Sequence, residues 1–430
     1  MQAVEQSRTP LLRVVLASLI GTTIEWYDFF LYGTAAALIF NKLFFPTFDP
    51  LTGTLLAFVT FAVGFVARPI GGIIFGHFGD HIGRKKLLML SLILMGASTT
   101  AIGLLPTYSC AGLLAPLMLV FLRLIQGFAV GGEWGGAVLM IAEYSPKEHR
   151  GFFASWPQFG VPAGNLLAAA SLAVMSATLS EEDFLQWGWR VPFLASAILV
   201  LVGWWIRQTV DESPLFRRIG SDERVAFPLA EVLRRHWRQV AIGVGVKTGS
   251  NIGFYAISAF GITWLTEING QPKSVALTAL LAGSAVQCLT IPLFSALSDR
   301  VGRRPVFISI SLIYAAFIFA FFPLLSSSHL TWIYLAVMFG LALDGALYGP
   351  QAAFLAELFP TPVRYSGASL AYQFSSIIGG SLTPIIAIAL FQQFGSSIPI
   401  SIYVSASLLV CTVVALLSRE TRRVELAEIH

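Results

Sequence analysis

Long apolar runs are the feature that most constrains this chain. Twelve stretches are each about 20 residues long, which is the length that a helix needs to cross a bilayer. They cover residues 14–40, 52–75, 87–105, 113–141, 152–175 and 189–206, and then residues 240–265, 275–297, 306–325, 332–355, 365–391 and 399–417. Because backbone polar groups in hydrocarbon must be satisfied within the chain, such runs form helices. The sequence therefore predicts an all-α polytopic membrane protein with twelve transmembrane helices.

The composition agrees with this prediction. Of the 430 residues, 56% are hydrophobic and only 12% are charged, and the mean hydropathy is +0.75. A soluble protein of this size could not cover its surface with so few charges. A soluble enzyme, a disordered chain and a nucleic-acid-binding domain are therefore excluded. Three scattered cysteines predict no disulfide framework, and the polar first ten residues, which lead into a long span, predict no cleavable signal peptide.

The charges predict the domain organisation and the orientation. The longest polar segment separates two sets of six spans, so we expect an N-terminal half at residues 1–206, a central cytoplasmic loop at residues 207–239 and a C-terminal half at residues 240–430. With the N-terminus in the cytoplasm, all but six of the 27 basic residues lie on the cytoplasmic side. Three of the six, Lys42, Arg190 and Lys273, lie on the far side and three lie inside spans. Both termini are therefore predicted to be cytoplasmic.

Two motifs recur in the two halves. The loop after span 2 has the pattern G-x-x-x-D-x-x-G-R-K around Asp80, and the loop after span 8 repeats its D-x-x-G-R-R part around Asp299. A second motif, E-x-x-P-x-x-x-R, follows span 4 and recurs after span 10. Two repeats at nearly the same spacing predict two homologous halves in parallel orientation. Together the motifs supply the candidate gating residues: Gly76, Asp80, Gly83, Arg84, Glu143, Arg150, Asp299, Gly302, Arg303, Glu357 and Arg364.

These loops have a physical interpretation as gates. Each aspartate lies at the cytoplasmic edge of the membrane, where it can pair with the following arginine or cap a neighbouring helix, and we expect each to latch its own half. The glycines permit a tight turn and close helix approach. Such contacts would hold the cytoplasmic side closed in one state and release it in another. The alternative is that the basic residues only set the membrane topology.

Several runs carry a resemblance to a known family. They are GTTIEWYDF at residues 21–29, FVARPIGG at 65–72, RLIQGFAVGGEWGG at 123–136, WGWRVPF at 187–193 and DESP at 211–214. Together with the repeated loops, they resemble the metabolite:proton symporters of the major facilitator superfamily, which include shikimate, citrate, 2-oxoglutarate and proline/betaine carriers. The first half is most similar to the shikimate carriers. The resemblance implies a carrier that works by alternating access, without a cofactor and usually as a monomer.

Ionisable residues lie inside the predicted spans: Glu25, Asp28, Arg68, Arg123, Glu133, Lys247 and Asp344. Each costs roughly 2.5–3.5 kcal/mol at a helix centre. Left unpaired, they would cost more than the ~5–15 kcal/mol that stabilises an ordinary domain. They must therefore be paired, protonated or exposed to a water-filled cavity. Four acids against three bases leave one acid that could carry a proton.

Asp28 and Arg123 form the pair that we expect to couple transport to protons. The resemblance supports this expectation, because proton-driven sugar carriers of the same superfamily use a span-1 acid and a span-4 arginine. A permanent structural ion pair is the alternative. Glu25, one turn earlier, and Asp344 are further candidates for the proton carrier. Glu133 lies in a glycine-rich stretch, which favours a structural or gating role over coupling.

Arg68 and Lys247 are the candidates for holding an anionic substrate, because a guanidinium fork matches a carboxylate. The alternative is that they pair with Asp28, Glu133 or Asp344. Further polar or aromatic side chains could line the site, although each could equally be a helix-packing residue: Gln126, Trp134, Gln158, Asn251, Tyr255, Gln287, Tyr372 and Gln373.

The sequence therefore predicts a secondary transporter in a bacterial inner membrane that imports a small organic anion with protons. A zwitterionic osmolyte symporter and an antiporter or uniporter on the same fold remain alternatives. A receptor would need an output domain, for which no segment is long enough. The six histidines show neither metal-ligand nor catalytic-triad spacing, and no phosphate-binding loop is present, so we expect no enzyme, no metal and no ATP. The expected partners are the substrate, protons and the lipid bilayer, with no nucleic acid.

Overall fold

A computed structural model of the chain describes residues 11–82, 84–131, 133–208, 228–360, 363–422 and 424–426. The first half contains α1 (Leu11–Ala35), η1 (Ala36–Phe40), α2 (Asn41–Phe44), α3 (Pro50–Ile82), α4 (Arg84–Leu104), α5 (Tyr108–Ala111), α6 (Leu114–Val130), α7 (Glu133–Tyr144), η2 (Lys147–His149), α8 (Arg150–Ala154), α9 (Trp156–Thr178), α10 (Glu181–Asp183), η3 (Phe184–Gly188) and α11 (Arg190–Gln208). The second half contains α13 (Pro228–Arg235), α14 (Trp237–Tyr255), η5 (Ala256–Phe260), α15 (Gly261–Thr263), η6 (Trp264–Ile268), α16 (Lys273–Val301), α17 (Arg303–Leu325), α18 (Leu330–Leu358), α19 (Arg364–Ser375), η8 (Ser376–Ser381), α20 (Leu382–Phe394) and α21 (Ile398–Leu417).

The all-α membrane fold is confirmed within the described residues. Eight segments are long and apolar enough to span a bilayer: Leu11–Phe44, Pro50–Gly72, Lys147–Thr178, Lys273–Val301, Arg303–Leu325, Leu330–Leu358, Arg364–Phe394 and Ile398–Leu417. A bent pair, Glu181–Gly188 and Arg190–Trp205, meets at 41° and forms a ninth. The remaining predicted spans correspond to α4, to α6 and to the continuous helix from α14 to η6. In span 4, where the sequence predicted one helix, the described helices are α6, which ends at Val130, and α7, which begins at Glu133.

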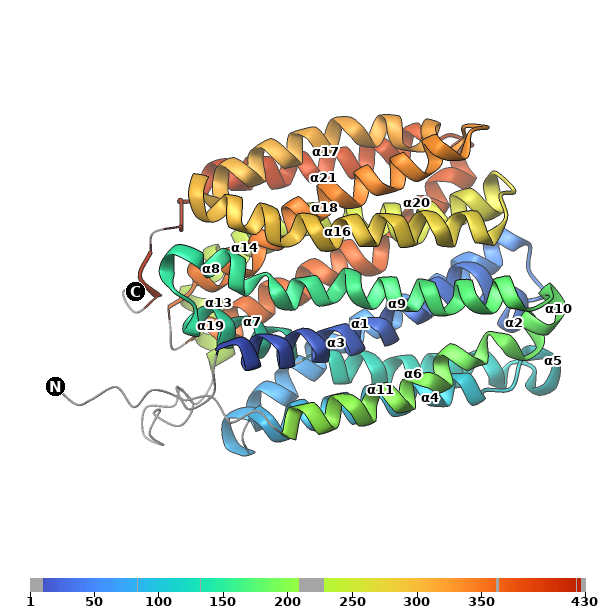
Figure 1. Ribbon diagram of the computed structural model, residues 1–430, viewed down its shortest axis with the longest axis horizontal. Coiled ribbons are helices and arrows are strands. Elements are labelled where there is room, and N and C mark those ends of the chain that lie inside the picture. The colour runs from blue at the N-terminus through green and yellow to red at the C-terminus, as the bar shows by residue number, and fades with distance from the viewer. Residues whose placement is uncertain are drawn as a thin grey trace.

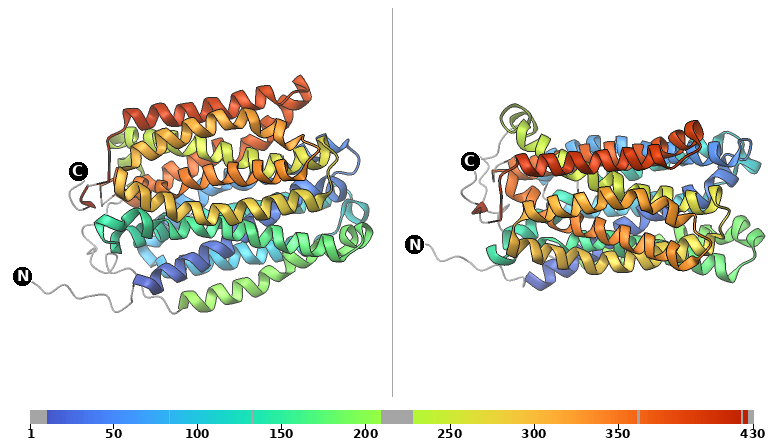
Figure 2. Two further views of the ribbon diagram at one scale, coloured as in Figure 1. Left: turned by 45° about the horizontal axis from the view of Figure 1, so that its top comes forward. Right: turned by 90° about the horizontal axis from the view of Figure 1, so that it is seen from above.

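The helices run side by side along one axis, with α1–α11 on one side of the molecule and α14–α21 on the other (Figures 1 and 2). We call these the N-terminal and C-terminal halves. α1 begins and α21 ends at the same end of the bundle, which we call the terminal end (Figure 1). α9 and α16 lie against each other where the halves meet. Large apolar side chains point outward from many helices, as expected for lipid-facing surfaces, for example Leu117, Phe121, Leu289 and Leu293.

Two helices are buried on nearly all sides and bring charged residues into the interior. Every residue of α1 from Ile24 to Ala35 is buried. In α18 the same holds from Leu343 to Glu357. A helix that is buried all round lies at the centre of a bundle. Glu25, Asp28 and Asp344 are therefore far from bulk water because of the position of their helices.

Glycines allow α3 and α6 to pack with their backbones in contact. A Cβ atom added to Gly127 would lie 1.9 Å from the carbonyl oxygen of Gly64, and one added to Gly71 would lie 1.9 Å from that of Phe128. No side chain fits in either place. Small residues at such contacts are typical of tightly packed membrane helices. This packing fixes Arg68 on α3 close to Arg123 on α6.

Candidate functional site

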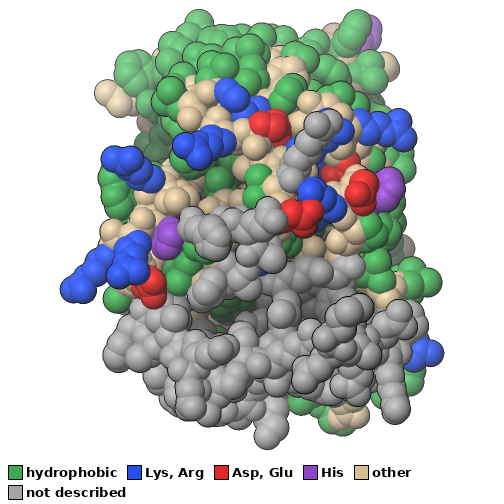
Figure 3. Space-filling model, turned by 90° about the vertical axis from the view of Figure 1, so that its left-hand side faces the viewer, with side chains coloured by type: hydrophobic (Ala, Val, Ile, Leu, Met, Phe, Trp, Pro, Cys, Tyr) green, Lys and Arg blue, Asp and Glu red, His purple; other side chains and the backbone are tan. Residues whose placement is uncertain are grey.

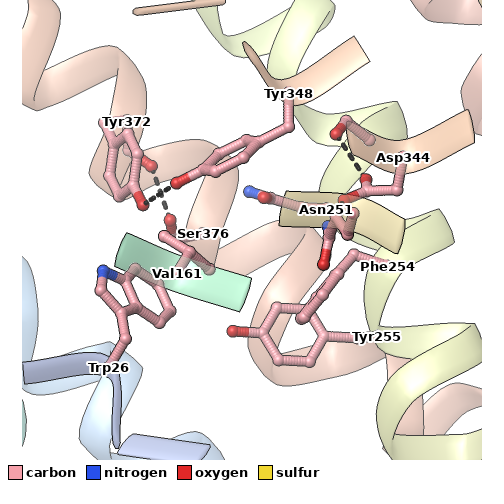
Figure 4. A pocket seen from close by; sticks show the side chains of 11 residues that line it. Trp26, Val161, Asn251, Phe254, Tyr255, Asp344, Tyr348, Tyr372 and Ser376 are labelled. Carbon is pink, nitrogen blue, oxygen red and sulfur yellow. Dashed lines mark hydrogen bonds between the residues drawn. The ribbon is translucent and has the colours of Figure 1, made fainter. Parts of the chain in front are cut away.

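A central pocket lies between the two halves, and about 370 Å³ of its region, open space included, is not filled by protein atoms. Trp26 of α1 and Val161 of α9 approach it from the N-terminal half. The C-terminal half supplies the rest of the lining: Ser250, Asn251, Phe254, Tyr255, Gln287, Asp344, Tyr348, Tyr372 and Ser376. Figure 4 shows aromatic rings, hydroxyls and amides facing one another across this space. Of the predicted lining residues, Asn251, Tyr255, Gln287 and Tyr372 therefore line the pocket, and so does the proton-carrier candidate Asp344.

Asp344 is held by neutral donors. It is 2% exposed, the Ser250 hydroxyl donates to its Oδ1 at 2.9 Å, and Gln287 Nε2 donates to its Oδ2 at 2.6 Å. Across the pocket the hydroxyls of Tyr348 and Tyr372 lie 3.4 Å apart (Figure 4). Among the described residues no ion pair includes Asp344. The pocket wall therefore carries an acid that hydroxyl and amide groups orient, with no basic residue in direct contact.

Arg68 is buried without a polar partner. It is 1% exposed, and none of its three guanidinium nitrogens makes a hydrogen bond. The guanidinium carbon instead lies 4.4 Å from the ring centres of Phe29 and Phe65 and 5.7 Å from that of Trp26. The predicted alternative, an ion pair with Asp28 or Asp344, is not formed in the described structure. Aromatic faces are thus the partner of this cation.

Lys247 has the same kind of environment in the other half. Its ammonium group is fully buried and has no hydrogen-bond acceptor. It lies 4.1 Å from the ring centre of Tyr372 and 4.6 Å from that of Tyr348. Both rings line the pocket, as does Trp26 beside Arg68. Each unpaired cation is therefore one ring away from the central space.

Asp28 and Arg123 are both 1% exposed, but no direct ion pair joins them. The Ser196 hydroxyl donates to Asp28 Oδ1 at 2.6 Å. Arg123 Nη1 donates to Gln126 Oε1 at 3.1 Å, and Gln126 Nε2 donates to Thr99 Oγ1 at 2.7 Å. Gln126 thus positions Arg123, and it does not line the pocket. The direct pair that the sequence suggested is absent from this conformation.

Arg123 and Glu25 are two further buried charges of the N-terminal half. The guanidinium of Arg123 lies 4.5–4.6 Å from the ring centres of Phe29, Tyr32 and Phe61. Phe29 is therefore shared between Arg123 and Arg68. Glu25 is 4% exposed and lies one turn before Asp28 on α1. The side chain of Glu133 lies outside the described residues, and its predicted role stays a prediction.

Three more predicted lining residues pack around the pocket and do not line it. Trp134 stacks on Tyr372 with ring centres 4.0 Å apart and donates to Gln158 Oε1 at 2.9 Å. Gln158 Nε2 in turn donates to the carbonyl oxygen of Tyr348 at 3.2 Å. Gln373 Nε2 donates to the carbonyl oxygen of Gly131 at 2.9 Å. The bonds of Gln158 to Tyr348 and of Gln373 to Gly131 cross between the halves, as does the Trp134–Tyr372 stack, so these residues hold the halves together around the site.

The gate residues at the terminal end also join the two halves. Both oxygens of Asp299, on α16, accept backbone N–H groups at the start of α8, from Gly151 at 2.8 Å and Phe152 at 2.9 Å. Asp299 Oδ1 also lies 2.8 Å from Arg303 Nη1. Asp299 therefore pairs with the arginine of its own loop, as the sequence suggested, and in addition joins its half to the opposite one. A carboxylate at a helix start satisfies free N–H groups, and here the available helix belongs to the opposite half.

Glu357 is the centre of a buried ion cluster at the same end. Its Oε1 lies 3.2 Å from Arg303 Nη2 and 3.3 Å from Arg150 Nη1, which belongs to the other half.

Two other predicted gate residues act within the C-terminal half. Arg364 Nε donates to the carbonyl oxygen of Phe359 at 3.0 Å. Gly302 has a φ of 110°, a conformation that favours glycine and that the D-x-x-G pattern predicts.

The side chains of the equivalent loop in the N-terminal half lie outside the described residues. Gly83 lies outside the described residues. The side-chain surroundings of Gly76, Asp80, Arg84 and Glu143 also lie outside them, so the predicted gating role of these residues stays a prediction. At the opposite end of the bundle, Glu181 Oε1 lies 3.2 Å from Lys42 Nζ and 3.3 Å from Lys273 Nζ, which belongs to the other half. The halves therefore contact each other on both sides of the pocket.

Sequence reasoning missed several residues of the site. The hydroxyl partners Ser196, Thr99 and Ser250 could have been found as polar residues inside apolar spans. The aromatic partners could not, because aromatic side chains occur in most spans and only the fold selects the few beside a cation. Within the described residues, no group of three His, Cys, Asp or Glu side chains could hold a metal ion.

Comparison with known proteins agrees with this architecture. A family model described as Sugar (and other) transporter matches residues 14–235, and one described as Major Facilitator Superfamily matches residues 248–428. The Shikimate transporter of Escherichia coli (strain K12) is 41% identical over 96% of this chain and 95% of its own. The Inner membrane metabolite transport protein YhjE of the same organism is 40% identical, with 97% of each chain covered. The Proline/betaine transporter of Salmonella typhimurium is 34% identical over 89% of this chain and 78% of its own.

A solved structure shares the fold. The proton:xylose symporter XylE bound to 6-bromo-6-deoxy-D-glucose superimposes with a TM-score of 0.78 over 97% of this chain and 98% of its own, at 18% sequence identity. These relatives are transporters and not enzymes. The chain therefore belongs to the major facilitator superfamily, as a multi-pass membrane transporter of the group of metabolite carriers that contains the shikimate and proline/betaine transporters.

Proposed function

We propose that this transporter imports a small organic anion together with protons by alternating access. The observation that carries the proposal is the pair of buried cations, Arg68 and Lys247, which form no ion pair with any described carboxylate and lie against rings of the central pocket. A buried cation is costly unless something neutralises it. A substrate carboxylate would do so and would gain charge-assisted hydrogen bonds in return.

The pocket lining favours a hydroxylated acid. Asn251, Ser376 and the phenol groups of Tyr255, Tyr348 and Tyr372 offer donors and acceptors along its wall. A hydroxy acid would match them, whereas a purely apolar substrate would leave them unsatisfied. The 41% identity to a Shikimate transporter supports the same class of substrate.

Asp28 is the proton carrier in this proposal, with Asp344, Glu25 and Glu133 as the other acids that could take the role. Its carboxylate is buried and is held by a serine, so no basic residue fixes it in the charged state. Gln126 links Arg123 to Thr99 by hydrogen bonds, and in the proposal a rearrangement of these bonds during transport brings Arg123 to Asp28. The shared fold with a proton:xylose symporter supports coupling to protons.

In the proposed transport cycle, the two ends of the molecule open in turn. In the proposal, residues 1–206 and 240–430 rock against each other about the pocket, joined by residues 207–239, with the terminal end in the cytoplasm. Exposed basic residues gather at that end, including Arg234, Arg235, Arg238, Arg300 and Arg419 (Figure 3), as the positive-inside rule requires of a cytoplasmic face. An inner-membrane relative supports a bacterial inner membrane as the location. We expect the transporter to act as a monomer.

A zwitterionic osmolyte is the second candidate substrate. Trp26, Phe254 and Tyr255 place aromatic faces in the same pocket as Asp344, and such faces bind quaternary ammonium groups. The 34% identity to a Proline/betaine transporter favours this candidate as well. An antiporter or uniporter for organic anions would use the same pocket, and only the driving force distinguishes them.

Uptake into proteoliposomes tests the proposal. Shikimate, a mono-, a di- and a tricarboxylate, proline and betaine would be compared as competitors of one labelled substrate. A monoanion carried with one proton moves no net charge, so uptake should follow a pH gradient and ignore a membrane potential, which is worth about 2.3 kcal/mol per charge at 100 mV. Preference for betaine or proline with voltage-driven uptake would establish the second candidate. Uptake that needs a countersubstrate and ignores the pH gradient would establish exchange. Asp49→Asn, in an exposed loop, is the matched control for carboxylate removal.

A further inference from the structure

The segment that follows α21 crosses the gate at the terminal end. Glu420 lies at the beginning of α17, where its Oε1 accepts the backbone N–H of Arg303 at 2.9 Å and its Oε2 accepts that of Arg304 at 3.0 Å. A carboxylate in this place satisfies two of the free N–H groups of the helix start. The segment is therefore anchored to the C-terminal half beside the repeated D-x-x-G-R-R loop.

The shape of that loop admits the carboxylate. A Cβ atom added to Gly302 would lie 2.7 Å from Glu420 Oε2, so any other residue here would displace the carboxylate. The positive φ of Gly302 turns the chain so that the next two N–H groups point at the same carboxylate. In this half the motif glycine therefore has a second role besides the turn, because it leaves room for the segment.

The next residues join the ion cluster and then reach the other half. The Thr421 hydroxyl donates to Glu357 Oε2 at 2.6 Å, on the carboxylate that also binds Arg303 and Arg150. Arg150 Nη1, in the N-terminal half, donates to the carbonyl oxygen of Val424 at 3.1 Å. Lys147, also in that half, makes an ion pair with Glu425. The segment thus contacts both halves at the end where they must separate.

We propose that residues 418–422 and 424–426 act as a clasp that holds the terminal end of the transporter closed. The inference rests on the proposed alternating access, because it concerns the step in which the terminal end opens. When the halves move apart there, the contacts of Val424 and Glu425 with the N-terminal half and the contacts of Glu420 with the C-terminal half cannot all persist. The clasp therefore lowers the fraction of carriers that are open at this end and raises the fraction available to substrate from the other side.

Distances between spin labels test the clasp without any substrate. Glu148→Cys, beside α8, and Arg300→Cys, near the end of α16, carry labels on exposed positions of opposite halves. Glu420→Ala and a chain that ends after Ser418 should each increase the open-to-closed ratio about fivefold or more, the usual size of a conformational coupling. Glu420→Gln keeps one acceptor oxygen and should lie between Glu420→Ala and the wild type. Glu231→Gln removes a carboxylate of a surface pair on the same end and should leave the distances unchanged.

Transport provides a second readout that a merely structural role would not move. If fewer carriers face the outside, the apparent affinity for external substrate falls by the same factor as their population, while the melting temperature of the variant stays near that of the wild type. Unchanged label distances in Glu420→Ala and in the shortened chain would overturn the clasp. The label distances are measured without substrate and without a proton gradient. This test of the clasp is therefore valid whether or not the organic-anion proposal holds.

Discussion

Replacing Arg68 should weaken substrate binding strongly and leave the fold intact. Its guanidinium makes no hydrogen bond and lies 4.4 Å from two ring centres. Truncating one partner of a buried charge pair costs about 2–5 kcal/mol, so Arg68→Met should reduce affinity for the carboxylate substrate by roughly 30-fold to a few thousandfold. Arg68→Lys should also fail, because a point charge does not replace the planar fork.

The stability of the same variant should move little. Arg68→Met loses a cation–π contact worth ~0.5–2 kcal/mol and removes an unpaired charge whose burial costs ~2.5–3.5 kcal/mol. The two effects oppose each other, so the melting temperature should stay level or rise. Calorimetric binding and thermal unfolding in detergent measure both quantities, with Arg235→Met, on an exposed arginine, as the control. Wild-type affinity in Arg68→Met would refute the reasoning, and so would a loss of stability as large as the loss of binding.

Four further predictions concern the proton, the gate, the packing and the clasp. Asp28→Asn should abolish uphill accumulation of substrate but retain part of the exchange of labelled for unlabelled substrate. Normal pH-driven accumulation by this variant would show that another acid carries the proton. Asp299→Asn should reduce turnover more than binding, because it weakens the cap between the halves far from the pocket; poor binding at normal turnover would contradict this. Gly127→Ala should lower the melting temperature, since its Cβ would lie 1.9 Å from a backbone oxygen of α3, and stability equal to the wild type would rule out that clash. Hydrogen bonding to Lys147 holds the pKa of Glu425 below its ordinary value. The ion pair of Glu425 is therefore fully present above the ordinary pKa of a glutamate and is lost only as the pH falls through the lowered pKa. The effect of Glu425→Gln on the label distances should thus be equal between about pH 5.5 and 7.5, and an effect that disappears at the lower pH would contradict this prediction.

The apolar runs were sufficient to predict the fold, because hydrocarbon leaves the backbone no alternative to helices. The π-helical turns at Ala36–Phe40 and Ser376–Ser381 were not predictable in the same way. Each depends on a local change in hydrogen bonding inside an apolar stretch, which leaves the hydrophobic pattern nearly unchanged. Helix existence follows from the solvent, whereas interruptions follow from packing between helices.

In the candidate site, too, one part could be predicted from the sequence, the burial of the charges, and another part could not, the partners of those charges. That Arg68, Lys247, Asp28 and Asp344 are buried followed from their places in the apolar runs, and the structure confirms it. Their partners did not follow, because the sequence argument balanced positive against negative charges and gave no weight to ring faces. The cross-half cap by Asp299 was missed for a related reason. The repeat compares each loop with its counterpart, whereas the helix start that this carboxylate caps lies in the other half and is brought there only by the fold.

Holding the cations on aromatic faces has a consequence for the speed of the carrier. A substrate that enters a site already locked by a salt bridge must first break it, and the protein must form it again before it can reset. Ring faces hold a cation by only ~0.5–2 kcal/mol, so Arg68 and Lys247 can exchange a ring for a carboxylate, and return, across a low barrier. Within the described residues, neither cation has to leave a carboxylate of the protein before it binds a carboxylate of the proposed substrate. Such a site favours rapid release of the substrate and rapid return of the empty carrier over the highest possible substrate affinity.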